Sequence, residues 1–119
     1  GICYKELGDM ESSIEYLSKY KTSDIMVGAA SQSALGDVYS EMGNYDMAVK
    51  TYLASVAKYD NAFSSPIILK KAGIVYEEMG EFKKALEVYE RVAKDFPETS
   101  EGREMKKYIG RVEAKVKSL

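Results

Sequence analysis

Two stretches of this chain, residues 34–52 and residues 72–89, carry almost the same residues at the same spacing. Both contain a glycine, a tyrosine, a second glycine, an aromatic residue, an alanine and a second tyrosine. In the first copy these are Gly36, Tyr39, Gly43, Tyr45, Ala48 and Tyr52, and in the second they are Gly73, Tyr76, Gly80, Phe82, Ala85 and Tyr89. A degraded third copy opens the chain, with Gly1, Tyr4, Gly8, Met10, Ser13 and Leu17 in the corresponding places. The chain is therefore an array of repeats.

The leading glycines of successive copies lie 35 and 37 residues apart. A period of about 34 residues with two helical patterns per unit is typical of helix-turn-helix repeats, which stack into a solenoid. At these residues the chain resembles the tetratricopeptide repeat family, and the resemblance covers nearly all of its length. It implies an all-α fold, a right-handed α-α superhelix of antiparallel helix pairs with a C-terminal capping helix.

We expect one domain over residues 1–119. Its parts would be a partial repeat over residues 1–24, a repeat over 25–64, a repeat over 65–98 and a capping helix over 99–119. Ile109 stands in the last helix where the repeats have a small residue. Because no partner helix follows, nothing excludes bulk at that position, as expected of a solvated cap.

Glycines predict where helices end. Gly8, Gly43 and Gly80 each stand where a helix could stop in the left-handed conformation that glycine adopts cheaply. We therefore expect a first helix to end at Gly8 and Asp9 to cap the next. The later helices are expected over residues 10–20, 25–42, 45–59, 66–79 and 81–95, and from about 100 to 117. Their starts would be capped by Ser23 or Asp24, by Ser65 before Pro66, and by Thr99 or Ser100.

Small residues predict close helix packing. Gly28 and Gly36 each lower helix propensity by about 1 kcal/mol relative to alanine. A helix that keeps such residues needs a close approach, so we expect partner helices to cross at Gly36, beside Ala48, and at the matching Gly73, beside Ala85. The inward stripe of residues 25–42 is expected at Val27 or Ala30, Ala34, Leu35, Val38 and Tyr39.

Two single residues have open interpretations. Phe63 lies in a connection longer than usual for the repeat, and it either plugs the end of the core or stays exposed as a contact residue. Cys3 is a half-buried helix residue or a reactive thiol. A lone cysteine cannot form an internal disulfide.

Composition excludes several classes of function. The chain has 17 basic and 19 acidic residues, a net charge of −2, which argues against nucleic acid as a partner. It has no histidine and one cysteine, so we expect no zinc site and no Ser-His or Cys-His catalysis. Glu77 and Glu78 are adjacent and point about 100° apart on a helix, so they do not face one site. We expect no catalytic residue, cofactor or metal, and no membrane-spanning stretch in this segment.

The resemblance also implies a binding surface. In tetratricopeptide repeat proteins the first helices of successive repeats line a concave groove that holds an extended peptide or a partner helix. The matching candidate groove residues here are Ser33, Asp37, Ser40, Glu41, Ile67, Lys70, Ile74, Glu77, Glu78, Arg103 and Lys106, with Ile2, Lys5, Glu6 and Glu113 at the two ends. For each residue taken singly, a solvated helix surface is the favoured interpretation over a contact. A lysine, asparagine and arginine clamp for terminal carboxylates is not seen, because Ser33, Asp37 and Ile74 occupy its places.

The leading hypothesis is a non-catalytic protein-protein interaction module, scaffold or chaperone-like. One alternative is an oligomerisation or spacer domain. The chain opens at Gly1 within the repeat pattern, which indicates a fragment, and residues 10–20 would expose an apolar face that a second copy could cover. Another alternative, an RNA-binding helical repeat, would want a basic groove, and Asp37, Glu41, Glu77 and Glu78 oppose it.

The late copies also resemble a narrower group. Residues 66–80 and the closing Phe96-Pro97-Glu98-Thr99-Ser100 are similar to bacterial tetratricopeptide proteins of the cell envelope, of the ancillary translocon-associated type. That resemblance implies a membrane anchor upstream of the repeats and a location facing the periplasm. The partner would then be another envelope or secretion component.

Overall fold

A computed structural model describes residues 4–20 and 22–118 of the chain. This part contains six α-helices and no strand. The helices are α1 (Tyr4–Lys19), α2 (Ile25–Glu41), α3 (Tyr45–Lys58), α4 (Ser64–Glu78), α5 (Phe82–Asp95) and α6 (Ser100–Lys117). The predictions made for Ile2, Cys3 and the side chain of Lys5 fall outside the described part.

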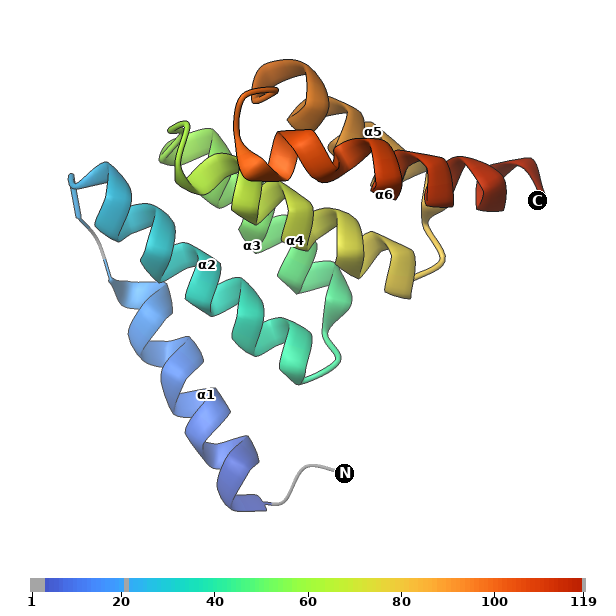
Figure 1. Ribbon diagram of the computed structural model, residues 1–119. Coiled ribbons are helices and arrows are strands. Elements are labelled where there is room, and N and C mark those ends of the chain that lie inside the picture. Colours follow the sequence, from blue (N-terminus) through green and yellow to red (C-terminus); the bar gives the residue numbers. More distant parts are fainter. Residues whose placement is uncertain (1–3, 21, 119) are drawn as a thin grey trace.

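The helices form two antiparallel pairs, α2 with α3 and α4 with α5, followed by α6. Helices α2, α4 and α6 make one layer, in which α2 and α4 run side by side in the same direction (Figure 1). Helices α3 and α5 cover the other side. The predicted all-α solenoid of helix pairs with a final capping helix is therefore confirmed.

The tight turns lie where glycine predicted them. Gly43 and Gly80 have φ values of 78° and 76°, and both end a helix in the left-handed region. The amides of Asn44 and Glu81 then return to the carbonyls of Tyr39 and Tyr76 at 2.9 Å. These bonds satisfy carbonyls that the helix end would leave free, and they reverse the chain within each pair.

The predicted caps at Asp24 and Thr99 are confirmed, whereas those at Ser65 and at Asp9, which lies inside α1, are wrong. Asp24 accepts from the amide of Val27 at 2.9 Å, and Thr99 accepts from the amide of Gly102 at 3.0 Å. Helix α4, however, begins at Ser64 rather than Pro66, and Ser65 does not cap it. The side chain of Asn61 accepts from the amides of residues 63 and 64 at 3.0 and 2.7 Å, so the first turn forms earlier.

The predicted break at Gly8 is also wrong. Helix α1 runs without interruption from Tyr4 to Lys19, and Gly8 has no positive φ. A reversal there would leave about two turns of helix to pack against the rest, whereas continuing the helix through a glycine costs only about 1 kcal/mol. Continuing the helix through Gly8 therefore costs less than reversing the chain there. The resulting α1 packs against α2 alone among the described helices.

The close approaches expected at the helix glycines are confirmed, and their partners are tyrosine rings. A Cβ placed on Gly36 would lie 2.5 Å from Cε1 of Tyr52, and one on Gly73 would lie 2.3 Å from Cε1 of Tyr89. Gly28 and Tyr59 form a third pair, also at 2.3 Å. Each ring lies where a side chain on the facing helix would be, so only glycine fits.

The buried side of α2 differs from the predicted stripe. Val27 and Ala30 are exposed, whereas Ala29 and Ser33 are buried along with Leu35. A single inward face was assumed, but α2 packs against α3 on one side and α4 on another. Because α3 and α4 cover different sides of α2, its buried residues spread over a wider arc of the helix than a single stripe would.

Helix α6 covers the end of the core. Met105 and Val112 are fully buried against α5, and Tyr108, Ile109 and Val116 pack beside them. Its first turn is fixed by a close backbone contact, because a Cβ on Gly102 would lie 1.9 Å from the carbonyl oxygen of Phe96. The final helix thus covers the core with one apolar face, as expected of a cap.

Replacing Gly73 by alanine should lower the free energy of unfolding by about 1–3 kcal/mol, because overpacking forces a buried ring out of place. The Tyr89 ring is fully buried and its hydroxyl is hydrogen-bonded, so it has little freedom to move. Gly110→Ala is the matched control within a helix, since a Cβ there meets nothing within 4 Å. It should raise stability by about 0.5–1 kcal/mol. Urea denaturation measures both variants; a Gly73→Ala protein as stable as the wild type would contradict the packing account.

Candidate functional site

A hollow of about 140 Å³ lies between the N-terminal halves of α2 and α4. It is lined by Ala29, Ala30, Ser33, Ser64, Ile67 and Ile68. No charged side chain is among these residues, so the hollow can hold apolar groups from a ligand. It lies in the layer formed by α2, α4 and α6, which the resemblance predicts to be the concave, binding layer.

Exposed apolar side chains lie at the starts of the two helices that flank this hollow. Among the described residues, Ile25, Met26 and Val27 are exposed in the first turn of α2, and Phe63 precedes α4 with 68% of its surface exposed. The interpretation of Phe63 as a core plug is therefore wrong. Its exposure is confirmed, and a contact with a partner stays a prediction. Ala30 also lines a second hollow of about 380 Å³ between α1 and α2, with Tyr16, Leu17, Tyr20, Val27 and Ser31. The apolar surface thus continues from α4 across α2 to α1.

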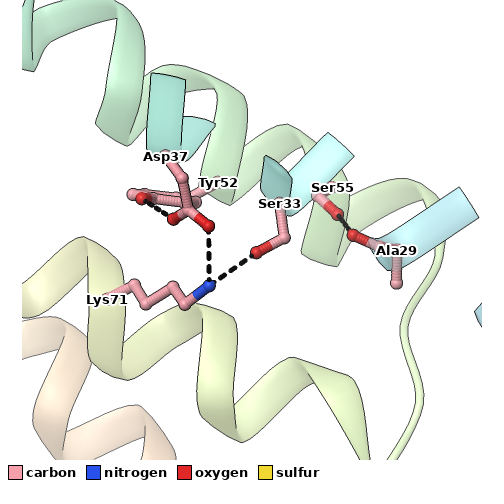
Figure 2. Close-up of polar contacts among 6 residues, drawn as sticks. All are labelled: Ala29, Ser33, Asp37, Tyr52, Ser55 and Lys71. Carbon is pink, nitrogen blue, oxygen red and sulfur yellow. Dashed lines mark hydrogen bonds and ion pairs between the residues drawn. The ribbon is translucent and has the colours of Figure 1, made fainter. Parts of the chain in front are cut away.

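Farther along α2, a polar network joins the two repeats. The Lys71 ammonium of α4 donates to Ser33 Oγ and Asp37 Oδ2 of α2, both at 3.1 Å (Figure 2). Tyr52 of α3 donates to the other carboxylate oxygen of Asp37. Close by, Ser55 Oγ donates to the carbonyl of Ala29 at 3.4 Å. Asp37 therefore ties its own repeat to the next one.

The second repeat has a corresponding network. Arg111 of α6 donates to both carboxylate oxygens of Glu77, at 3.1 and 2.6 Å, and Tyr89 of α5 donates to Glu77 at 2.6 Å. Only 12% of the Glu77 side chain is exposed. Glu77 lies one turn later in its helix than the counterpart of Asp37, yet it accepts from the equivalent tyrosine. In both networks a carboxylate lies between a tyrosine of its own repeat and a cation of the next helix in the same layer, α4 or α6.

A third contact joins α4 to α6. Lys70 donates to Glu104 at 2.5 Å, and its ammonium lies 5.0 Å from the ring centroid of Tyr108. Within the described residues three ion pairs join different helices, and each joins residues 34 positions apart: Asp37 with Lys71, Lys70 with Glu104 and Glu77 with Arg111. Opposite charges at the repeat period were thus a sequence signal for these contacts, and Lys71, Glu104 and Arg111 were not among the predicted residues.

The structure brings some predicted groove residues together and separates others. Ser33, Asp37, Lys70 and Glu77 take part in the contacts between helices and are partly or fully withdrawn from solvent. Ile67 lines the apolar hollow. Glu6, Glu41, Ile74, Glu78, Arg103, Lys106 and Glu113 are exposed, and Ser40 is half-buried. Lys106 lies five residues before Arg111, about 140° around α6, and so on a different face from the one that contacts α4.

Burial and the carboxylates change the acidity of the network. Burial, followed by the hydrogen bond to Asp37 and the charge of Asp37, raises the pKa of Tyr52. Burial and Glu77 raise the pKa of Tyr89 in the same order. The hydrogen bond to Glu104 raises the pKa of Lys70, and that to Glu77 raises the pKa of Arg111. The tyrosines thus stay neutral donors and the cations stay charged, which favours a fixed scaffold over proton transfer.

The described residues contain no group of three His, Cys, Asp or Glu side chains that could hold a metal ion. The same part of the chain has no helix with the length and apolar character needed to cross a bilayer.

These features define a helical-repeat protein built from stacked helix pairs. Family models of the tetratricopeptide repeat match residues 28–98 and residues 1–24. The first match covers more than half of the chain, which therefore belongs to the tetratricopeptide repeat family. Repeats of this family generally mediate protein-protein interaction and are typically not catalytic. Comparison with curated proteins found no match.

The tyrosine networks predict an alkaline loss of stability. An unfolded tyrosine loses its proton near pH 10. The raised pKa values of Tyr52 and Tyr89 mean that their contribution is present below about pH 10 and is lost as the pH rises toward the folded-state values. Tyr89→Phe should flatten this dependence, while Tyr16→Phe, at a residue 68% exposed, is the control.

The measurement is urea denaturation of the wild type and both variants at pH values from about 8 to about 11.5. This window brackets the pKa of a tyrosine in the unfolded chain. If Tyr89→Phe and Tyr16→Phe lose stability equally with pH, the buried hydroxyl does not contribute as described.

Proposed function

We propose that the concave layer of α2, α4 and α6 binds a segment of another protein, either an extended peptide or a helix, without catalysing a reaction. The observation that carries this proposal is the apolar hollow between α2 and α4, with exposed Met26 and Phe63 beside it. Large apolar side chains exposed together around a concavity mark interaction surfaces. Family membership supports a protein as the partner.

The residues proposed to contact a partner are those that the stack leaves accessible. Ile67 and Ile74 on α4 offer apolar surface, and Glu41 and Glu78 offer charge. Ser33, Asp37, Lys70 and Glu77 instead hold the helices in place, since each is bonded to a neighbouring helix. Arg103 is an exposed contact candidate at the start of α6.

A scaffold or chaperone-like role remains part of this proposal. The narrower resemblance, to envelope proteins of the ancillary translocon-associated type, gains no support from the family models, which match at the level of the repeat. A bacterial origin, an upstream anchor and a periplasmic location stay predictions from the sequence. Nucleic acid is not a proposed partner, because its phosphates would meet Asp37, Glu41 and Glu78.

The test is a substitution that fills the hollow with charge. Ala30→Glu places a carboxylate at the apolar lining, so specific binding should fall by at least about tenfold, the effect of about 1.4 kcal/mol. Ala57→Glu makes the same chemical change at an exposed position of α3, outside this layer, and should bind as wild type.

Proteins captured from native cell extract by the wild-type chain would be identified by mass spectrometry and their affinities measured with purified partners. Partners retained equally by Ala30→Glu and Ala57→Glu would contradict binding in this layer.

A second candidate function, self-association through the N-terminal helix, rests on a different observation. Helix α1 packs only against α2 among the described helices, and Tyr16 on it is 68% exposed beside the hollow lined by Leu17 and Val27. A second copy could cover this apolar surface. The chain would then serve as an oligomerisation or spacer domain.

Light scattering over a concentration series should show the wild-type chain passing from monomer to dimer. Tyr16→Asp should move this transition to at least about tenfold higher concentration, because the charge must be desolvated in the contact. Ile74→Asp is the control, since it introduces the same charge at an exposed apolar residue that lines the hollow between α4 and α6 rather than the one between α1 and α2. A wild-type chain that is monomeric at every concentration would exclude this candidate.

A further inference from the structure

The adjacent surfaces of α2 and α4, here called the trough, begin at the hollow between Ala30 and Ile67 and change their chemistry toward the C-terminal ends of the two helices. Equivalent residues of the two helices lie 37 positions apart in the sequence, so the pairs Ala30 with Ile67 and Glu41 with Glu78 mark the same two levels. At the first level the lining is apolar, and Met26 and Phe63 add exposed apolar surface. At the second level both positions are glutamates. Helices α2 and α4 thus both carry apolar residues near their first turns and a glutamate at their last.

The acidic end is only partly neutralised from within. The cations of α2 and α4 are Lys70 and Lys71. Lys70 is bonded to Glu104 of α6, which leaves Lys71, bonded to Asp37 and Ser33, to set against Asp37, Glu41 and Glu78. Glu41 and Glu78 are exposed and form no ion pair or hydrogen bond within the described part of the chain. Three carboxylates against one ammonium leave two negative charges at the C-terminal ends of α2 and α4.

The cations of α6 do not remove this excess. Arg111 binds both carboxylate oxygens of Glu77, so it is already engaged. Lys115 lines the same hollow as Glu78, but it makes no ion pair among the described residues and its ammonium lies 5.1 Å from the ring centroid of Phe82. The positive charge of Lys115 can therefore offset the negative charge of Glu78. It leaves the negative charge of Glu41 in place.

We propose that this trough selects a partner segment that combines apolar side chains with a basic side chain, lysine or arginine. The apolar side chains would occupy the hollow at Ala30 and Ile67, and the basic one would lie between Glu41 and Glu78. This inference rests on the proposed function of the concave layer and adds the chemistry of its ligand. It follows from charge complementarity, since an acidic segment would meet like charges in the same place.

The spacing within such a segment follows from helix geometry. Eleven residues separate Ala30 from Glu41 and Ile67 from Glu78, which is about 16 Å along each axis at 1.5 Å per residue. In an extended segment the basic residue would stand about five positions from the apolar anchor, and in a helical one about eleven.

The experiment is a selection from a phage-displayed library of random peptides of about 12 residues, which reach about 40 Å when extended. Three proteins serve as bait: the wild type, the variant Glu41→Lys with Glu78→Lys, and the control Glu87→Lys with Glu90→Lys. The control makes the same charge change on exposed positions of α5, in the other layer. Circular dichroism verifies that all three are helical.

Peptides enriched by the wild type and by the control should combine apolar residues with lysine or arginine. The trough variant should lose this basic preference. The best wild-type peptide should bind the trough variant at least about tenfold more weakly and the control within about twofold, and its affinity for the wild type should fall with added salt because exposed charges are screened.

Other outcomes separate this inference from the proposed function. If the trough variant enriches equally basic peptides while Ala30→Glu loses them, the concave layer binds peptides but the acidic end does not select them. If Ala30→Glu also retains the same peptides, or if the wild type enriches none, both the inference and the proposed function are wrong.

Discussion

The stack depends on tyrosine rings lying against glycines of the facing helix. Where Gly36 meets Tyr52 and Gly73 meets Tyr89, the absence of a side chain lets the ring lie across the helix backbone. That position carries each hydroxyl to a carboxylate on the facing helix, Asp37 or Glu77. The carboxylate in turn binds a cation of the following helix. A contact that begins as packing within a repeat therefore fixes the next repeat as well.

This arrangement divides the side chains of the α2, α4 and α6 layer into those that hold the helices together and those that stay accessible. The ion pairs of Asp37 and Glu77 lie between α2 and α4 and between α4 and α6, where they are shielded in part from solvent. What stays accessible is an apolar surface where α2 and α4 begin and a surplus of carboxylates where they end. Because both features recur in each repeat, α2 and α4 lie side by side with their apolar ends together and their acidic ends together.

Much of the fold followed from local rules in the sequence. The repeat period, the turns at Gly43 and Gly80 and the caps at Asp24 and Thr99 are each set by a few neighbouring residues, and the structure confirms them. Gly8 was misread because glycine permits a helix end without requiring one. The start of α4 was misread because Asn61 competes with Ser65 for the first turn, and its side chain reaches the free amides earlier.

The sequence by itself determined that the chain is a row of helix pairs, and that glycine is needed where helices approach. It also placed the candidate surface on the first helix of each pair. Only the tertiary structure decided which of those residues remain free, because Asp37 and Glu77 are bonded to residues 34 positions away. Such partners depend on how far one repeat is rotated and shifted against the next. That geometry is set by the packing of whole helices, which no local pattern contains.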